Sequence, residues 1–366
     1  MRILVHSPVG LTTGYGRDGV GLVMALLNAG HDVDLVPSAV NVPVPSEVAD
    51  LLSFYPDGHY DLEIHHVPPT GATSRSMGIG EHPPRKRVLW TMWEWDTFPE
   101  SVESYDRAAN YVSSYDHVVL YTEQTREAFE GAGMFDKHRP PISIVQGGFE
   151  PDSWFLPTDK KAIPFGGGEM DRSKARDTFR FGMVGVLGIR KNPYNVIQAF
   201  VDLKSEHGED FDAVLLLKTD FPLVPNSFDV PDISIIQNVT WKDEQLRAFY
   251  WNLDCLINVS WGEGKDLPAL EATMCGTPTI LNDTPGHQGW IHPGIQKLIP
   301  AVPMYMDPEY RGRYTGRKEI KEAMWEAYTN RVPNFRRAKQ LADYVERRVS
   351  WEHRIKKFGE AIGVTL

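Results

Sequence analysis

Short apolar segments that alternate with helical segments constrain the fold of this 366-residue chain more than any other feature. Such alternation is typical of parallel sheets covered by helices. A first series of strands is predicted at residues 2–9, 31–36, 62–67, 88–92, 117–121 and 142–145. A second series is predicted at residues 179–184, 213–218, 233–236, 255–259, 279–281 and 297–299. Helices are expected at residues 19–29, 318–329 and 334–362.

A segment rich in proline, glycine and charge, residues 152–177, separates the two series and predicts an interdomain linker around Gly166–Gly168. The chain length also suits two domains of ordinary size. We therefore expect an α/β fold with two Rossmann-like, doubly wound domains. The predicted parts are an N-terminal domain at 1–160, a second domain at 178–335 and a helical segment at 336–366.

Composition excludes several classes of protein. The net charge of −11 argues against broad electrostatic binding to nucleic acid or anionic lipid, although a local basic patch would override it. No apolar run reaches membrane-spanning length, and residues 1–8 read as a strand rather than a signal peptide. The only cysteines, Cys255 and Cys275, lie in apolar segments. Free thiols in a reducing, cytoplasmic compartment are therefore expected.

The segment 260–278 places two carboxylates, Glu263 and Glu271, around a turn that opens a short helix. Asp266 is the predicted N-cap, and Gly276 is expected to close the helix. The free backbone amides and the positive dipole end of such a helix start attract anions, typically phosphate.

Helical spacing places Leu267, Leu270 and Met274 toward the core, and Glu271 shares that face. A carboxylate there needs polar partners, which ligand hydroxyls would supply. Two structural interpretations stay open. In the first, Glu263 follows Ser260 by three residues, as in a capping box, and only finishes the turn. In the second, Glu271, which a capping box does not explain, is a structural buried carboxylate.

This segment resembles the signature of retaining group 1 glycosyltransferases of GT-B fold, usually Glu-Gly-Phe-Gly-Leu-Pro-x-Leu-Glu. The family includes phosphatidylinositol mannosyltransferases and sucrose and glycogen synthases. Here Lys265 and Asp266 replace the usual Phe and Gly. The resemblance implies two domains facing a cleft and transfer of a sugar from a UDP- or GDP-linked donor with retention of configuration. It also implies that no metal or other cofactor is needed.

The resemblance assigns roles to individual residues. Glu263 is implied to contact donor-sugar hydroxyls, and Glu271 to hold the nucleotide ribose. The intervening backbone amides are implied to bind the diphosphate: Gly264, Lys265, Asp266 and Leu267.

A second glycine-containing turn, residues 182–193, follows a predicted strand. Within it, Lys191 matches the family lysine that neutralises the donor diphosphate, and Arg190 would assist. Gly185 matches a family glycine that is often followed by arginine, whereas this chain has Val186. Without the resemblance, Lys191 reads as a solvated side chain on an exposed loop.

The glycine-rich segment 12–19 is predicted to be a loop between the first strand and the first helix. Loops at this edge of an α/β sheet bind ligands. By resemblance, Gly14 and Gly16 lie beside the donor, and Arg17 and Asp18 face the acceptor. The spacing is not that of a dinucleotide fingerprint, which disfavours a nicotinamide or flavin enzyme.

Trp93, Glu94 and Trp95 follow the predicted strand at 88–92. Tryptophan faces stack on sugars and carboxylates accept from hydroxyls, so the two Trp side chains are candidates for acceptor contact. Buried aromatic core is the alternative for both. Relatives place a histidine near this point. Either Glu94 replaces that histidine as a catalytic residue, or the histidine has no equivalent in this chain.

The resemblance extends to stand-alone bacterial or phage-encoded transferases, whose acceptors are glycans, lipids, proteins or modified DNA bases. It also implies that the C-terminal helical segment packs on the N-terminal domain through five apolar residues: Tyr344, Val345, Trp351, Ile355 and Phe358. No metal triad is predicted, because the adjacent His65 and His66 point to opposite faces of a strand. An epimerase or hydrolase of the same fold and a non-catalytic binder of nucleotide sugars stay as alternatives.

Overall fold

The protein is described by a computed structural model that covers residues 1–53, 58–69, 84–98, 108–136, 138–151, 153–155, 163–165, 168–170, 178–219, 231–237 and 241–366. The chain forms two compact units. Unit 1 comprises residues 1–150, 305–311 and 348–366, and unit 2 comprises residues 151–304 and 312–347. Each unit is described by itself.

Unit 1 contains a parallel sheet with strand order β2-β1-β3-β4-β5-β6. Its strands are β1 (Arg2–Val9), β2 (Asp32–Val40), β3 (Leu62–His65), β4 (Arg87–Thr91), β5 (His117–Leu120) and β6 (Ile142–Ile144). Its helices are α1 (Gly14–Asn28), α2 (Ser46–Ala49), α4 (Glu123–Gly131) and α11 (Trp351–Ile362). The strands β1, β3 and β4 are buried on both faces, which explains the apolar runs of β1 and β4, whereas β3 also buries Glu63 and His65.

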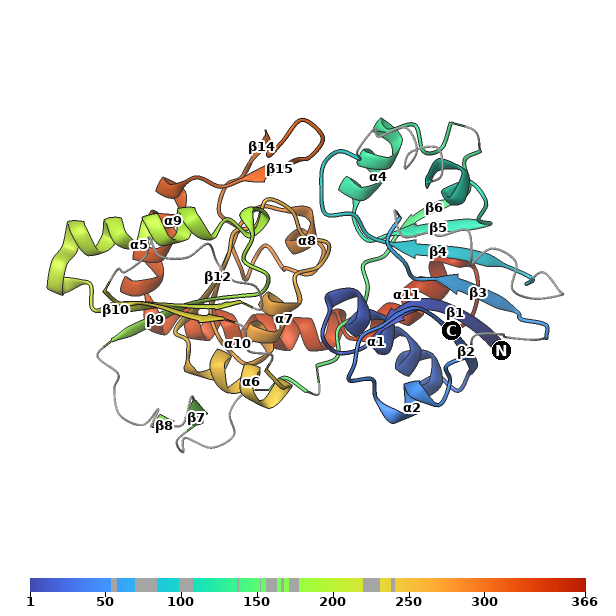
Figure 1. The fold of residues 1–366 in the computed structure, drawn as a ribbon, viewed down its shortest axis with the longest axis horizontal. Coiled ribbons are helices and arrows are strands. Elements are labelled where there is room, and N and C mark those ends of the chain that lie inside the picture. The colour runs from blue at the N-terminus through green and yellow to red at the C-terminus, as the bar shows by residue number, and fades with distance from the viewer. Residues whose placement is uncertain are drawn as a thin grey trace. The chain divides into compact units, whose positions relative to one another are not determined.

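Helices cover both faces of this sheet, with α1, α2 and α11 on one side and α4 on the other (Figure 1). The core on the α1 side takes in Trp351, Ile355 and Phe358 of α11. The Phe358 ring stacks on Trp90 of β4 with ring centroids 4.2 Å apart. The last helix of the chain is thus part of the core of unit 1, whereas Tyr344 lies in unit 2 against His292.

Unit 2 contains a second parallel sheet with strand order β11-β10-β9-β12-β13. Its strands are β9 (Phe179–Val184), β10 (Ala213–Thr219), β11 (Ile233–Gln237), β12 (Cys255–Asn258) and β13 (Thr279–Leu281). Its α-helices are α5 (Pro193–His207), α6 (Asp243–Asn252), α7 (Leu267–Met274), α8 (Pro285–Gln288), α9 (Arg317–Thr329) and, apart from its last residue, α10 (Arg331–Arg348). Helices α5 and α6 lie on opposite sides of the sheet (Figure 1).

Short elements complete the fold. Two 3₁₀ turns, η1 (Ile189–Lys191) and η2 (Gly208–Asp210), flank α5. The strands β14 (Val302–Tyr305) and β15 (Arg311–Tyr314) form one small sheet, and β7 (Ile163–Phe165) pairs with β8 (Gly168–Met170) in another. The β7–β8 pair lies within the predicted linker, whose Gly166 and Gly167 fall outside the described residues.

The structure corrects two predicted elements. The segment 12–19 is not a loop, because α1 begins at Gly14 with Thr13 as its N-cap; the Thr13 side chain accepts from the Gly16 amide. The strand expected at 297–299 is reduced to an isolated bridge between Asn282 and Ile299. Cys255 and Cys275 are both free and buried, as predicted. Among the described helices, none combines the length and apolarity needed to cross a membrane.

Candidate functional site

The turn between β12 and α7 in unit 2 carries the motif that the sequence singled out. Helix α7 begins at Leu267 with Pro268 in its first turn, and the helix closes at Gly276, whose φ of 71° is left-handed. Asp266 precedes the helix with φ 68° and ψ 72°. This conformation favours glycine and is unusual for other residues, although aspartate tolerates it better than most.

Asp266 occupies the N-cap position of α7, as predicted, but its side chain makes no capping hydrogen bond. Its carboxylate accepts from Asn258 Nδ2 at 2.7 Å and lies 2.8 Å from His287 Nε2. His287 Nδ1 lies 2.8 Å from the Asn282 carbonyl, so both ring nitrogens face acceptors. Burial would lower the pKa of His287, but the hydrogen bond and charge of Asp266 raise it. Asp266 is therefore held by Asn258 at the end of β12 and by His287 of α8 rather than by its own helix.

Glu263 and Lys191 form a buried ion pair at the same turn. Lys191 Nζ lies 2.5 Å from Glu263 Oε1 and 3.9 Å from an Asp266 carboxylate oxygen. Arg190 Nη1 lies 3.4 Å from Glu263 Oε1 and also donates to the Gly262 carbonyl. Burial alone would raise the pKa of Glu263, but the charges of Lys191 and Arg190 lower it to about 2. The carboxylate is ionised and faces two cations.

Lys191 is only 7% exposed, which corrects the expectation that it lies on an exposed loop. The residue closes the η1 turn, which brings it back against the motif of α7. Two glycines permit this close packing. Gly185 has φ 133°, and a side chain at Gly286 of α8 would lie 2.2 Å from the Glu263 carbonyl oxygen.

Glu271 points into the protein, as predicted, and is 4% exposed. Tyr250 of α6 donates its hydroxyl to Glu271 Oε2 at 2.7 Å, and burial together with this carboxylate raises the pKa of Tyr250. Leu270 and Met274 are buried on the same helix, whereas Leu267 is only half-buried. Leu267 is therefore less buried than predicted.

Gly264 and Lys265 complete the turn and are both buried. The Lys265 carbonyl accepts from Trp290 Nε1 at 2.8 Å, which fixes the backbone just before Asp266. Unit 2 thus brings together a consistent set of predicted residues: Gly185, Arg190, Lys191, Glu263, Gly264, Lys265, Asp266, Leu267 and Glu271.

In unit 1, the predicted glycine-rich segment forms the first turn of α1. Gly14 is exposed and Gly16 is buried, with no room for a side chain because the Gly10 carbonyl oxygen would lie 2.5 Å away. Arg17 is half-buried, and Asp18 is 2% exposed. Asp18 accepts from the Tyr121 hydroxyl at 3.0 Å, so its carboxylate faces the interior of unit 1.

The aromatic pair after β4 packs within unit 1. Trp95 is buried against Tyr310, with centroids 5.3 Å apart. Trp93 is half-buried on Phe98 and donates its indole N–H to the Thr97 carbonyl at 2.7 Å. Both rings therefore have packing roles, the alternative that the sequence left open, and Glu94 beside them is half-buried.

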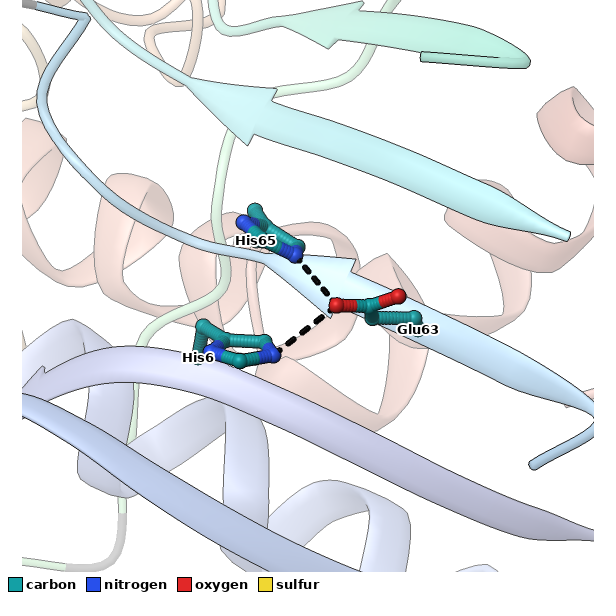
Figure 2. Close-up of side chains that lie close together, drawn as sticks. All are labelled: His6, Glu63 and His65. Atoms are coloured by element: carbon teal, nitrogen blue, oxygen red, sulfur yellow. Dashed lines mark hydrogen bonds and ion pairs between the residues drawn. The ribbon is translucent and has the colours of Figure 1, made fainter. Parts of the chain in front are cut away.

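Sequence reasoning missed a cluster on neighbouring strands of unit 1. Figure 2 shows His6 of β1 and His65 of β3 both directed at the carboxylate of Glu63. Glu63 Oε1 lies 2.9 Å from His6 Nε2 and 2.7 Å from His65 Nε2, and Arg87 donates to Oε2 at 2.9 Å. Burial would raise the pKa of Glu63, but its contacts with the two histidines lower it well below its usual range. Burial lowers the pKa of His65 to about 4.

The histidines and the glutamate of this cluster are visible in the sequence, but only the order of the strands shows that they are neighbours. Because β1 pairs with β3 in parallel and His6 is in register with His65, two histidines 59 positions apart become neighbours. Glu63 lies two residues before His65 and shares its face. Likewise, Asn258, Tyr250 and His287 were not predicted as partners of the motif carboxylates, because nothing local in the sequence links them.

The arrangement in unit 2 suits an anionic ligand that also carries hydroxyls. The start of α7 and the cations Arg190 and Lys191 provide positive charge for phosphate. The ionised Glu263 accepts hydrogen bonds beside them. A phosphate group with an attached sugar presents both kinds of partner.

Comparison with known proteins agrees with this chemistry. Residues 236–358 match the sequence profile described as "Family 4 Glycosyltransferase in conflict systems", a segment that includes Glu263 and Glu271. No curated protein matches the chain by sequence. The likeness to group 1 glycosyltransferases predicted from the motif is therefore supported independently at residues 236–358.

Solved structures share the fold over nearly the whole chain. HepE of Anabaena, solved in complex with UDP and glucose, has a TM-score of 0.64 and 13% identity, over 99% of each chain. Sucrose-phosphate synthase from Thermosynechococcus elongatus has a TM-score of 0.66 and 14% identity, over 99% of this chain and 98% of its own. The trehalose-6-phosphate synthase OtsA has a TM-score of 0.63 and 10% identity, over 100% of each chain. The predicted fold class, GT-B with two Rossmann-like domains, is confirmed.

Proposed function

We propose that the chain is a glycosyltransferase that moves a sugar from a nucleotide-diphosphate donor to an acceptor hydroxyl. The observation that carries this proposal is the buried Lys191–Glu263 pair at the start of α7. The family profile at residues 236–358 supports it, as does the fold shared with HepE, which was solved with UDP and glucose.

In this proposal the donor diphosphate lies at the start of α7. The backbone of residues 264–267 and the cations Arg190 and Lys191 bind its oxygens. As the bond between the sugar and the diphosphate breaks, negative charge grows on the leaving oxygen, and Lys191 stabilises it. Glu263, now sharing Lys191 with the diphosphate, accepts hydrogen bonds from sugar hydroxyls. Glu271 and Tyr250 form the wall that accepts the ribose.

We further propose that transfer occurs with retention of configuration and without a metal ion at the donor site. The acceptor oxygen attacks the anomeric carbon on the face that the diphosphate leaves, and the departing phosphate takes the acceptor proton. Arg17 and Glu94, both half-buried, are the side chains that we propose for contact with the acceptor. A glycan, lipid, protein or modified DNA base would present the hydroxyl.

A panel of UDP- and GDP-linked sugars tests the proposal. Thermal shift and calorimetry measure donor binding, hydrolysis measures release of the sugar, and mass spectrometry detects transfer to candidate acceptors. Glu263→Gln serves as the loss variant, and Glu244→Gln, on helix α6 away from the motif, serves as the matched control. Donor binding without hydrolysis or transfer would indicate a binding protein, and an isomerised donor would indicate an epimerase. Absence of donor binding would refute the proposal.

A further inference from the structure

The cluster of His6, Glu63 and His65 offers three metal-ligating groups at one point in unit 1. Their ligand atoms lie within 4.8 Å of one another, and all three side chains are buried (Figure 2). Two imidazoles and one carboxylate are the ligand types that zinc takes in proteins. They come from two strands whose register is fixed by main-chain pairing, so the side chains are held together by the sheet itself.

His6 is buried without the hydrogen bonds that an imidazole makes in water. It is 2% exposed, and within the described part of the chain neither of its ring nitrogens makes a hydrogen bond. Nε2 lies 2.9 Å from Glu63 Oε1, but the contact does not have the alignment of a hydrogen bond. A buried polar group without a partner costs free energy, and a bound cation would remove that cost.

From these contacts we propose that His6, Glu63 and His65 bind one divalent cation of the zinc class. In a tetrahedral site with bonds of about 2.0–2.1 Å, neighbouring ligand atoms lie about 3.3 Å apart. The separations of 2.9 Å and 2.7 Å at Glu63 Oε1 need only small side-chain adjustments to reach that value. A water molecule would take the fourth position.

The surrounding groups orient the ligands. Arg87 holds Glu63 Oε2, so Oε1 is the oxygen that faces the two imidazoles and would bind the ion. His65 Nδ1 lies 3.1 Å from the Tyr111 hydroxyl, which directs Nε2 toward the cluster. Partners of this kind fix ring orientation and tautomer in metal sites. Since the ion would join β1 to β3 in the body of the sheet, its role is structural, and the inference does not depend on the proposed transfer reaction.

Metal analysis of the full chain tests the inference. The chain is produced in zinc-supplemented medium, dialysed against metal-free buffer and analysed by mass spectrometry for metals. We expect about one zinc per chain. Chelation should lower the melting temperature, and Zn²⁺ but not Mg²⁺ should restore it, because binding to the folded state alone stabilises that state.

Two ligand variants and one control complete the design. His6→Gln and His65→Gln should hold less than about a tenth of the wild-type zinc, since each removes one of three protein ligands. His138→Gln, at an exposed histidine of the same unit, should hold as much as wild type. Circular dichroism of each variant establishes that it is folded. If the three side chains only neutralise one another, the wild-type chain will bind no zinc and Zn²⁺ will not change its melting temperature. That result would overturn the inference. Equal zinc in the wild type and both ligand variants overturns it as well.

Discussion

At the scale of the residue, Asp266 illustrates how this chain departs from the motif that it resembles. The family usually has glycine at this position, and the left-handed φ of 68° explains that preference. Here Asn258 and His287 hold the aspartate in the same conformation by binding its carboxylate. The substitution therefore preserves the turn that precedes α7 while adding a buried acid to the site.

The Asp266–His287 pair predicts a pH dependence of stability. The folded-state pKa of His287 is raised above 6.5, so the pair stabilises the fold fully below that pH and loses its contribution as the pH rises through the raised value. Urea unfolding at about pH 6 and about pH 9 measures this, with His287→Gln as the reference. The wild type should lose more stability than the variant over this interval. Parallel pH profiles would contradict the pairing.

Substitutions at Lys191 should affect the stability of the fold and the rate of transfer separately. Because the residue is buried against Glu263, Lys191→Met should destabilise the fold by about 3 kcal/mol, since it leaves only Arg190 facing the carboxylate. The double variant Lys191→Met with Glu263→Gln removes both charges and should recover most of that loss. Both variants should transfer sugar about 10²-fold more slowly, the effect of a lost contact to the leaving group. Denaturant melts and initial rates measure the two effects, and near-normal rates would leave Lys191 a structural role only.

Glu271 predicts a loss of nucleotide affinity. If its carboxylate binds the ribose, Glu271→Gln should weaken UDP or GDP binding by about 1–3 kcal/mol. Isothermal titration calorimetry measures this, with Glu244→Gln, at an exposed acid of α6, as the control. Unchanged affinity for both nucleotides in Glu271→Gln would show that Glu271 is only a structural buried acid.

Individual residues also mark the limit of what the sequence predicts. The burial of Glu271 followed from helical spacing, and the helix end at Gly276 followed from a local rule. The burial of Lys191 did not follow, because it depends on a charge 72 positions away that only the folded chain brings close. The partners of Asp266 and Glu271 were missed for the same reason.

At the scale of the element, local patterns predicted strands better than connections. Strands β1, β9 and β13 have their predicted limits, because a continuous apolar run ends where polar or turn residues begin. Helix α1 begins five residues earlier than predicted, at Gly14 rather than Gly19. Its first turn contains two glycines with low helix propensity, and the cap from Thr13 and the tight packing of Gly16 override that propensity.

Packing of helix α11 is expected to contribute to the stability of unit 1. Phe358 is fully buried and stacks on Trp90, so Phe358→Ala should destabilise unit 1 by about 3–5 kcal/mol. Phe155→Ala, at an exposed phenylalanine in unit 2, should change stability much less. Calorimetric melts measure the stability of both variants.

Deleting the residues after Trp351 should abolish activity although it removes no residue assigned to the donor site. A fully active truncation would contradict the role of α11.

At the scale of the whole molecule, the chain passes between its two units at residues 150/151, 304/305, 311/312 and 347/348. The composition of the linker predicted the first passage approximately. The others lie in regular elements or beside them: β14 and β15 flank residues 306–310, and α10 ends at Arg348. Tyr344 and Phe358 have the same apolar character in the sequence but pack in different units, because the passage falls at the end of α10.

The last prediction concerns the reaction of the intact chain. If the acceptor attacks on the face that the diphosphate leaves, the product should keep the anomeric configuration of the donor, which proton NMR of the glycosidic linkage reads directly. Transfer should not need Mg²⁺ or Mn²⁺, because Arg190, Lys191 and the start of α7 supply the positive charge that a metal would otherwise provide. A chelator distinguishes this from the zinc inferred in unit 1. Loss of that zinc should lower both the activity and the melting temperature, and Zn²⁺ should restore both. If a metal acted at the donor site, a chelator would abolish activity without changing the melting temperature, and Mn²⁺ would restore the activity. An inverted product, or that second pattern, would contradict the mechanism.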